Sequence, residues 1–342
     1  MLPRPQGSVG GWCLRSNRLD ISPRVGIYAV AKFLAHVTPV EVLAKFGMTE
    51  AIPKGKGQLA VFRRFVPFEI NTTALVEGVT PAPNMLQYED VSVVISQYGA
   101  WVNFTDVILD THEDPNLNKI VMGLGEQAAA VKEAIIWAEL VGGTNVLYSG
   151  TATSRATVAA PIAEEDLIAA QRYLKAAKAK PITRMLKAST NIATEPVAPA
   201  YIAFGHTNLE PDFRALTGFV PREKYSQYNV VSEWELGKFQ DIRVVLSPDL
   251  EIFYGAGSGT VTGVLSADGD NVDVYPIVVI GQDAYGIVPL RGMDSATVTV
   301  KNPTPTYEDP LAQRGFASYK MWYAALRLNE SWMVRIEAAA SA

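Results

Sequence analysis

Cysteine and histidine are scarce in this chain. Cys13 is the single cysteine among 342 residues, and the three histidines lie far apart at positions 36, 112 and 206. One cysteine allows neither an intrachain disulfide nor a cysteine-based zinc cage, which favours a reducing cytoplasm as the site of synthesis. Three scattered histidines offer little for a metal site or a Ser-His-Asp relay, so most hydrolase chemistries are disfavoured.

The chain also lacks a basic excess and a long uninterrupted hydrophobic run. Lys and Arg number 30 against 35 Asp and Glu, a net charge of −5, which disfavours sequence-specific DNA binding. The apolar stretch 25–43 is broken by Lys32, Pro39 and Glu41, and residues 1–15 have no apolar core typical of a signal peptide. We therefore expect no membrane span. With 48% apolar and 19% charged residues, the chain is predicted to be globular and long enough for two lobes.

Three short motifs could carry chemistry, but each departs from the pattern that its chemistry needs. The glycine-rich run 255–259 lacks the Lys-Ser/Thr of a phosphate-binding loop and is predicted to be a flexible surface loop. Asp268, Asp270 and Asp273 resemble a calcium loop without its closing glutamate. The run 112–114 places its three polar residues too close together to share a helix face. We expect no catalytic residue, cofactor or metal, and hence no enzyme.

The N-terminal part is predicted to be an arm. Its first 24 residues are rich in Gly, Pro and Ser and carry four arginines, Arg4, Arg15, Arg18 and Arg24, against Asp20 alone. A solvated basic tail is the simplest interpretation. Helical spacing over 25–37 and a Thr38-Pro39 start predict two short helices, the second ending at Gly47. Two short helices cannot form a core, so they need another surface to pack on.

A projecting loop and a long helix follow. Residues 58–65 and 91–107 are rich in Val, Ile, Phe and Tyr and predict two strands, joined by the polar connection 69–90. So long a connection predicts a projecting two-stranded loop. From Asp114-Pro115 to Gly142-Gly143 the period becomes helical. The apolar stripe of this predicted helix comprises Ile120, Leu124, Ala128, Val131, Ile135 and Ala138.

The remainder predicts a mixed α+β fold. Helices are expected over 164–179 and 209–216, the first with an acidic start at Glu164, Glu165 and Asp166. The strands expected from apolar runs cover 200–204, 242–246, 275–280, 319–328 and 332–338. This inventory suits contacts with neighbouring subunits better than the enclosure of a substrate.

Several strings in the chain resemble the major capsid proteins of tailed bacteriophages with the Hong Kong 97-like (Johnson) fold. They are IPKGKG at 52–57, FRRF at 62–65, LVEGVTP at 75–81, LGEQAA at 124–129, GGTNV at 142–146 and DPLAQR at 309–314. The similarity covers roughly residues 25–338. It implies an N-arm at 1–47, an E-loop at 48–110, a spine helix at 111–143, a peripheral domain at 144–165 with 297–342, and an axial domain at 166–296.

The function that this resemblance implies is structural. The chain would assemble with itself into hexamers and pentamers of an icosahedral phage head, inside the bacterial host, and the virion capsid would enclose double-stranded DNA without sequence specificity. Portal, scaffolding and cement proteins are candidate partners. An encapsulin-like nanocompartment shell is the alternative, and a stand-alone hydrolase is a distant third.

The resemblance also indicates which residues would contact other molecules. In the E-loop the candidates for contact between subunits are Arg63, Arg64, Glu69, Leu75, Val76, Glu77, Met85 and Leu86. The arm arginines at 4, 15, 18 and 24 are candidates for contact with the lumen or with a neighbouring subunit. Some capsids of this fold join subunits through an isopeptide bond from an E-loop lysine. Here no lysine lies between Lys56 and Lys119, which predicts a noncovalent shell.

Overall fold

The computed structural model describes most of the chain from residue 42 onward. The described residues are 42–53, 55–66, 68, 70–72, 74, 77–78, 80, 83–107, 116–187, 193–225, 230–259, 261–290, 296–305, 307 and 309–342. The predicted basic arm, the helix over 25–37 and the motif at 112–114 lie outside them. Of the second predicted short helix, the described part forms a 3-10 helix at Leu43–Lys45.

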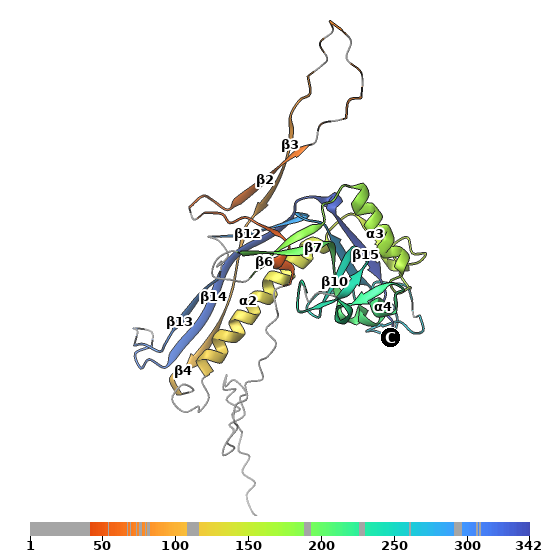
Figure 1. Ribbon diagram of the computed structural model, residues 1–342. Coiled ribbons are helices and arrows are strands. Elements are labelled where there is room, and N and C mark those ends of the chain that lie inside the picture. Colours follow the sequence, from red (N-terminus) through yellow and green to blue (C-terminus); the bar gives the residue numbers. More distant parts are fainter. Residues whose placement is uncertain are drawn as a thin grey trace, which may run out of the picture. The chain divides into compact units, whose positions relative to one another are not determined.

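The first of two large sheets has five strands. Its order is β1 (Met48–Thr49), β12 (Tyr285–Pro289), β14 (Arg314–Arg327) and β13 (Ala296–Lys301), with β4 (Ser96–Thr105) also paired to β14. All pairs are antiparallel except β1 with β12. The long strand β14 therefore serves as the backbone of this sheet, and Figure 1 shows it running beside helix α2 (Asn116–Val141).

The second large sheet has eight strands. Its order is β5 (Val146–Tyr148), β15 (Met333–Ala338), β11 (Tyr275–Ile280), β7 (Ala193–His206), β10 (Ile242–Ser247), β9 (Glu235–Phe239) and β8 (Phe219–Pro221), and β6 (Ile182–Lys187) also pairs with β7. Every residue of β10 and β11 is buried. A strand covered on both faces reads as a largely apolar run, interrupted in β10 by Arg243 and Ser247, which is why these two were predictable from sequence.

Helices α3 (Glu164–Ala176) and α4 (Glu210–Ala215) pack on one face of the eight-stranded sheet. Leu167 and Leu174 of α3 and Phe213 of α4 are fully buried there. The acidic start of α3 has a specific partner, because Asp166 Oδ2 accepts hydrogen bonds from the Ala163 amide at 3.0 Å and from Ser149 Oγ at 2.7 Å. Both predicted helices are present, and the first ends three residues earlier than expected.

The extent of the long helix was predicted correctly, but the prediction of which residues form its buried face was correct only in part. Leu124 and Ala128 pack against the five-stranded sheet as expected. Towards the C-terminus, however, Ile136 is fully buried, Ile135 is half-buried and Ala138 is exposed. The buried face changes because the 3-10 helix at Leu43–Lys45 and β12 cover a second side of α2. That cover comes from segments distant in sequence, which the local periodicity does not reveal.

The two strands predicted on either side of the long connection are present with altered bounds. Strand β2 spans Leu59–Val66 and pairs in antiparallel register with β3, Gln87–Val94. After Ile95 the chain enters β4, which belongs to the five-stranded sheet. The predicted single strand over 91–107 is therefore two strands in different sheets, and the connection is shorter at its C-terminal end than predicted.

The glycine-rich run 255–259 is not the free surface loop that was predicted. The Gly257 amide donates to the Val272 carbonyl at 2.9 Å, and the Ser258 amide donates to the Val158 carbonyl at 2.9 Å. A Cβ at position 257 would lie 2.8 Å from both of those carbonyl oxygens, so only glycine fits. The buried carboxylate of Asp273 holds the same region by accepting from the Gly255 and Ala267 amides, each at 2.8 Å. This aspartate has a structural role in the loop.

Candidate assembly surface

The β2–β3 hairpin carries two of the predicted contact residues, and both are engaged within their own chain. Strand register places Arg63 opposite Asp90 and Arg64 opposite Glu89. Arg63 donates from Nε to Asp90 Oδ1 at 2.8 Å and from Nη2 to Oδ2 at 2.9 Å, while Arg64 Nη2 bonds Glu89 Oε2. The guanidinium lowers the pKa of Asp90 through these hydrogen bonds, and the carboxylate raises the pKa of Arg63. Exposed pairs of this kind fix side-chain positions more than they stabilise the fold.

One face of the hairpin base is attached to the five-stranded sheet. Phe62 and Val91 pack against a buried cluster that includes Ile95, Val288 and Leu326. The opposite side and the far end are exposed. An isolated two-stranded hairpin is only marginally stable in water, so this attachment is what holds it in place.

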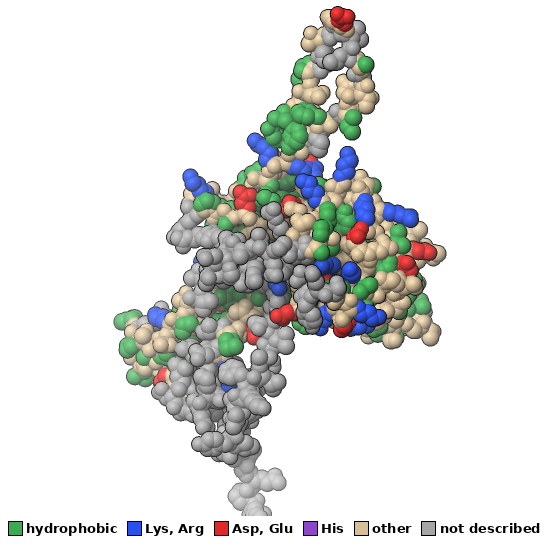
Figure 2. Space-filling view, in the orientation of Figure 1, with side chains coloured by type: hydrophobic (Ala, Val, Ile, Leu, Met, Phe, Trp, Pro, Cys, Tyr) green, Lys and Arg blue, Asp and Glu red, His purple; other side chains and the backbone are tan. Residues whose placement is uncertain are grey.

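The exposed part of the hairpin is rich in large apolar side chains. Figure 2 shows hydrophobic side chains gathered along it. Phe65 forms edge-on contacts with Phe68 and Tyr88, with ring centroids 5.3 and 6.4 Å apart. The exposed apolar residues here are Leu59, Val61, Phe65, Val66, Phe68, Ile70, Met85, Leu86, Tyr88 and Val94. Exposed apolar side chains in such number are typical of sites of interaction with another protein.

The structure locates some of the predicted contact residues and not others. Met85 is 80% exposed and Leu86 is 52% exposed, and Glu77 is exposed near the far end of the loop. Glu69, Leu75 and Val76 lie outside the described residues, as do the four arginines of the N-terminal arm. The inter-subunit role of all of these residues stays a prediction.

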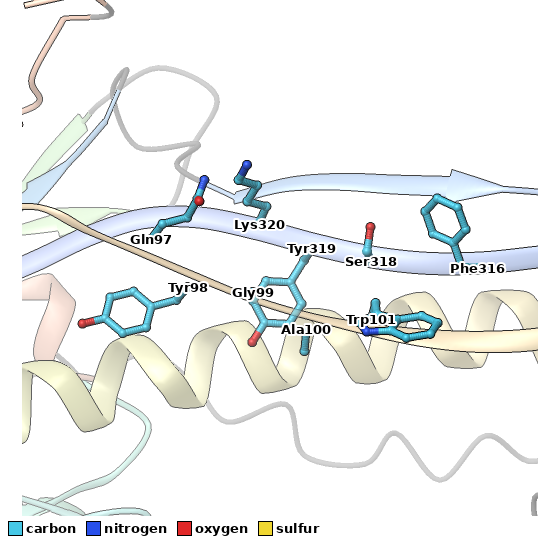
Figure 3. A pocket seen from close by; sticks show the side chains of 9 residues that line it. All are labelled: Gln97, Tyr98, Gly99, Ala100, Trp101, Phe316, Ser318, Tyr319 and Lys320. Atoms are coloured by element: carbon cyan, nitrogen blue, oxygen red, sulfur yellow. The ribbon is translucent and has the colours of Figure 1, made fainter. Parts of the chain in front are cut away.

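A second exposed feature, a shallow hollow on β4 and β14, was missed at the sequence level. It has a volume of about 560 Å³ (Figure 3). Trp101, which is 67% exposed, lies directly opposite Ser318, and Gly99 lies opposite Lys320. Strand alternation could have placed Trp101 on the face away from α2, because its neighbours Ala100 and Val102 pack towards that helix. The residues of β14 that line the hollow lie next to Trp101 only because of the register between β4 and β14.

A buried polar network lies between β9, β10 and the segment before β9. Glu235 is 1% exposed, and it accepts hydrogen bonds from the Val231 amide at 2.6 Å and from Tyr225 Oη at 2.9 Å. Arg243 Nη1 lies 3.7 Å from the same carboxylate. Burial raises the pKa of Glu235 and also that of Tyr225. Burial disfavours the charged form of Glu235, and its hydrogen bonds and the nearby Arg243 offset part of that cost.

The described residues contain no cluster of three or more His, Cys, Asp and Glu side chains that could hold a metal ion. Within the same part of the chain, none of the helices has the length and apolar character needed to cross a membrane.

A sequence model of the family described as "Phage capsid protein" matches residues 88–336, which is well over half of the chain. The chain belongs to the phage capsid protein family. A curated relative, the major capsid protein of Pseudomonas phage KPP21, is 23% identical over 271 residues. That match covers 72% of this capsid protein and 66% of the relative's length, just under two thirds.

Solved structures of phage capsids share the fold of this chain. The capsid of Ralstonia phage GP4 superposes with a TM-score of 0.63 at 12% identity, covering 86% of this chain and 87% of the other. The head structure of Helicobacter pylori bacteriophage KHP40 gives 0.62 at 12% identity, with the same coverage of both chains. The Hong Kong 97-like fold and its α+β class, expected from the sequence, are confirmed.

An encapsulin shares the fold as well. The SrpI encapsulin complex from Synechococcus elongatus gives a TM-score of 0.53 at 8% identity, covering 88% of each chain. At such low identity the likeness concerns fold alone. The family model that matches this chain describes phage capsid proteins.

Proposed function

We propose that this protein is the major capsid protein of a tailed phage, the subunit of an icosahedral head built from hexamers and pentamers around double-stranded DNA. Family membership over residues 88–336 is the observation that carries the proposal. The net charge of −5 suits a shell around packaged DNA, because a strongly basic lining would bind phosphates tightly and oppose loading and release. Assembly would take place in the cytoplasm of the bacterial host.

The β2–β3 hairpin would act as the E-loop of this shell and contact the adjacent subunit. Its exposed apolar side chains, from Phe65 and Phe68 to Met85 and Leu86, leave area that the isolated subunit does not cover. Arg63 and Arg64 already have carboxylate partners on β3. Pairing of these arginines with carboxylates of a neighbouring subunit would therefore require an exchange of partners.

The division into N-arm, E-loop, spine helix, peripheral domain and axial domain belongs to the same proposal. Helix α2 would be the spine helix. The two large sheets run across the proposed boundaries, because β5 and β15 lie in the sheet with β7, β10 and β11, whereas β12 lies in the sheet with β14. Each large sheet therefore contains strands from both the proposed peripheral domain and the proposed axial domain.

The encapsulin-like alternative is favoured by one observation, the shared fold with the SrpI encapsulin. Nuclease protection of particles from infected cells distinguishes the two functions. A phage head should protect genome-length DNA from added nuclease and should contain no stoichiometric enzyme. Shells that hold an enzyme and no DNA would support the nanocompartment instead.

A further inference from the structure

The C-terminal end of α2 lies between the two large sheets. The last four carbonyls of a helix have no partner within the helix and need donors from elsewhere. Two of them are satisfied locally, because the Gly142 amide donates to the Ala138 carbonyl at 3.2 Å and the Gly143 amide donates to the Leu140 carbonyl at 3.3 Å. The carbonyls of Glu139 and Val141 remain.

These two carbonyls accept hydrogen bonds from arginines of different sheets. Arg327, the last residue of β14 in the five-stranded sheet, donates from Nη1 to the Glu139 carbonyl at 2.9 Å. Arg335, on β15 in the eight-stranded sheet, donates from Nη1 to the Val141 carbonyl and to the Gly143 carbonyl, the latter at 3.1 Å. Cations are favoured at a helix C-terminus by the helix dipole. One helix end is thus bound by both sheets.

Carboxylates hold both arginines in place. Glu330 Oε2 lies 3.1 Å from Arg327 Nε, and its other oxygen accepts from Thr144 Oγ1 at 3.0 Å, directly after the helix. Glu337, which is fully buried, lies 2.8 Å from Arg335 Nε. Within the described residues Arg335 Nε makes no hydrogen bond, so Glu337 attracts Arg335 through charge, while Arg155 donates the hydrogen bonds to that carboxylate at 2.9 and 2.6 Å.

The backbone after the end of α2 leaves just enough room for the side chain of Arg327. A Cβ at Gly142 would lie 2.5 Å from Arg327 Nη1, so a larger residue would displace the guanidinium. Two of the three connections between the sheets, from β11 to β12 and from β14 to β15, also meet here; the third, from β4 to β5, contains α2 itself. The amides of Leu328 and Asn329 both donate to the Ala284 carbonyl, at 2.9 and 3.1 Å.

We propose that Arg327, Glu330 and Arg335, together with residues 139–144 at the end of α2, form a junction that fixes the angle between the two sheets and thereby sets the curvature of the shell. This inference rests on the proposed shell function. In a shell of hexamers and pentamers the subunits occupy different positions, but every copy contains this junction, so a change in the angle that it permits acts on all of them. Arg327 is a positioning residue, because it acts through α2 and does not itself need to touch a neighbour.

The test uses the full-length protein and measures shell diameters by cryo-electron microscopy. Arg327→Gln removes the cation, and Arg314→Gln is the matched control, the same change at an exposed arginine on the same strand. Glu330→Gln is a second, milder variant that keeps an oxygen for Thr144. We expect both junction variants to lose the single diameter of the wild-type shell, with circular dichroism unchanged, and the control to retain it.

Each outcome is decisive. A single wild-type diameter in both junction variants would overturn the proposal, as would loss of that diameter in Arg314→Gln. If Arg327→Gln fails to fold, the diameters from Glu330→Gln decide. Absence of shells from the wild-type protein in the same assay would instead refute the shell function, and the junction proposal with it.

Discussion

Buried charged side chains of this capsid protein form ion pairs and hydrogen bonds with specific neighbours. Glu337, with no exposed surface, bonds Arg155 Nε at 2.9 Å and Nη2 at 2.6 Å, and Arg155 stacks over the Phe253 ring with its Cζ atom 3.5 Å from the centroid. Asp212 accepts a hydrogen bond from the Ser341 amide at 3.0 Å. Removing one member of such a pair leaves the other buried without compensation, which is a larger loss than the pair's own contribution.

Glu235 gives a pH-dependent prediction at the residue scale. The groups facing it are Tyr225, Arg243 and, at longer range, Arg222, while Lys238 lies over the Tyr225 ring. Burial raises the pKa of Glu235 above its unfolded value near 4.5, so the folded state favours the protonated form. The ionised form therefore reduces stability at neutral pH, and stability is recovered as the pH falls through the raised folded pKa.

The variant Glu235→Gln imitates the protonated form and should remove this dependence. We expect the melting temperature of the wild type, measured relative to that of Glu235→Gln, to rise as the pH is lowered from 7 towards 4.5. Thermal unfolding of the unassembled subunit across this range is the measurement. A constant difference between the two proteins would show that the carboxylate is ionised throughout.

A second residue-scale prediction concerns the buried face of α2. Ile136→Asp places an unpaired charge in the core and should reduce the free energy of unfolding by several kcal/mol, of order 3–5. Ile135→Asp should cost less, because Ile135 is half-buried, and Ala138→Asp on the exposed face should have little effect. Chemical denaturation of the three variants gives the order. Equal losses at Ile136 and Ala138 would contradict the helix orientation described above.

At the scale of elements, the β2–β3 hairpin is the part of the chain whose change should affect assembly and leave folding of the subunit intact. Its register places Val66 opposite Gln87, so a two-residue Asn-Gly turn can join them in place of residues 67–86. We expect the shortened subunit to fold, with a circular dichroism spectrum close to that of the wild type, and to form no shells. Sedimentation velocity is the measurement.

A point-variant pair sharpens the same prediction. Met85→Ser combined with Leu86→Ser removes exposed apolar area from the loop, and Asn84→Ser is the control in the same segment. The double variant should assemble poorly and the control normally. Wild-type assembly by both the double variant and the shortened subunit would refute a role of this loop between subunits.

Elements with a strong local signal could be predicted from the sequence, whereas contacts between residues far apart in the sequence could not. Strand β11 is a continuous apolar run, β10 is one apart from Arg243 and Ser247, and α2 has a clear helical period with Gly142-Gly143 at its end. The pairing of Arg63 with Asp90 depends on the hairpin register, and the hollow beside Trp101 depends on β14, more than 200 residues away. Distant partners of this kind leave no periodic trace in a single sequence.

The end of α2 shows the same limit. The two glycines there predict a helix stop, and the helix does stop at Val141. That the glycines also admit Arg327 and Glu330 follows only from the tertiary structure. The resemblance to capsid proteins, carried by short strings such as GGTNV, identified the fold where local physics alone predicted only an α+β class.

At the scale of the whole molecule, the shell is predicted to be noncovalent. The segment between Lys56 and Lys119 contains no lysine, so the hairpin lacks the amine that an isopeptide bond needs, and arginine stays protonated and is a poor nucleophile. Mature particles boiled in detergent with reductant should run as a single band near 37.1 kDa. A ladder of covalent oligomers would show that another lysine, outside the hairpin, joins the subunits.

The central claim is that many copies of this chain close into a shell, and direct imaging of the purified wild-type protein tests it. Negative-stain electron microscopy across a range of salt and protein concentrations should show closed particles with hexameric and pentameric units. Uniform monomers or dimers under every condition, together with the absence of shells in infected cells, would contradict the account.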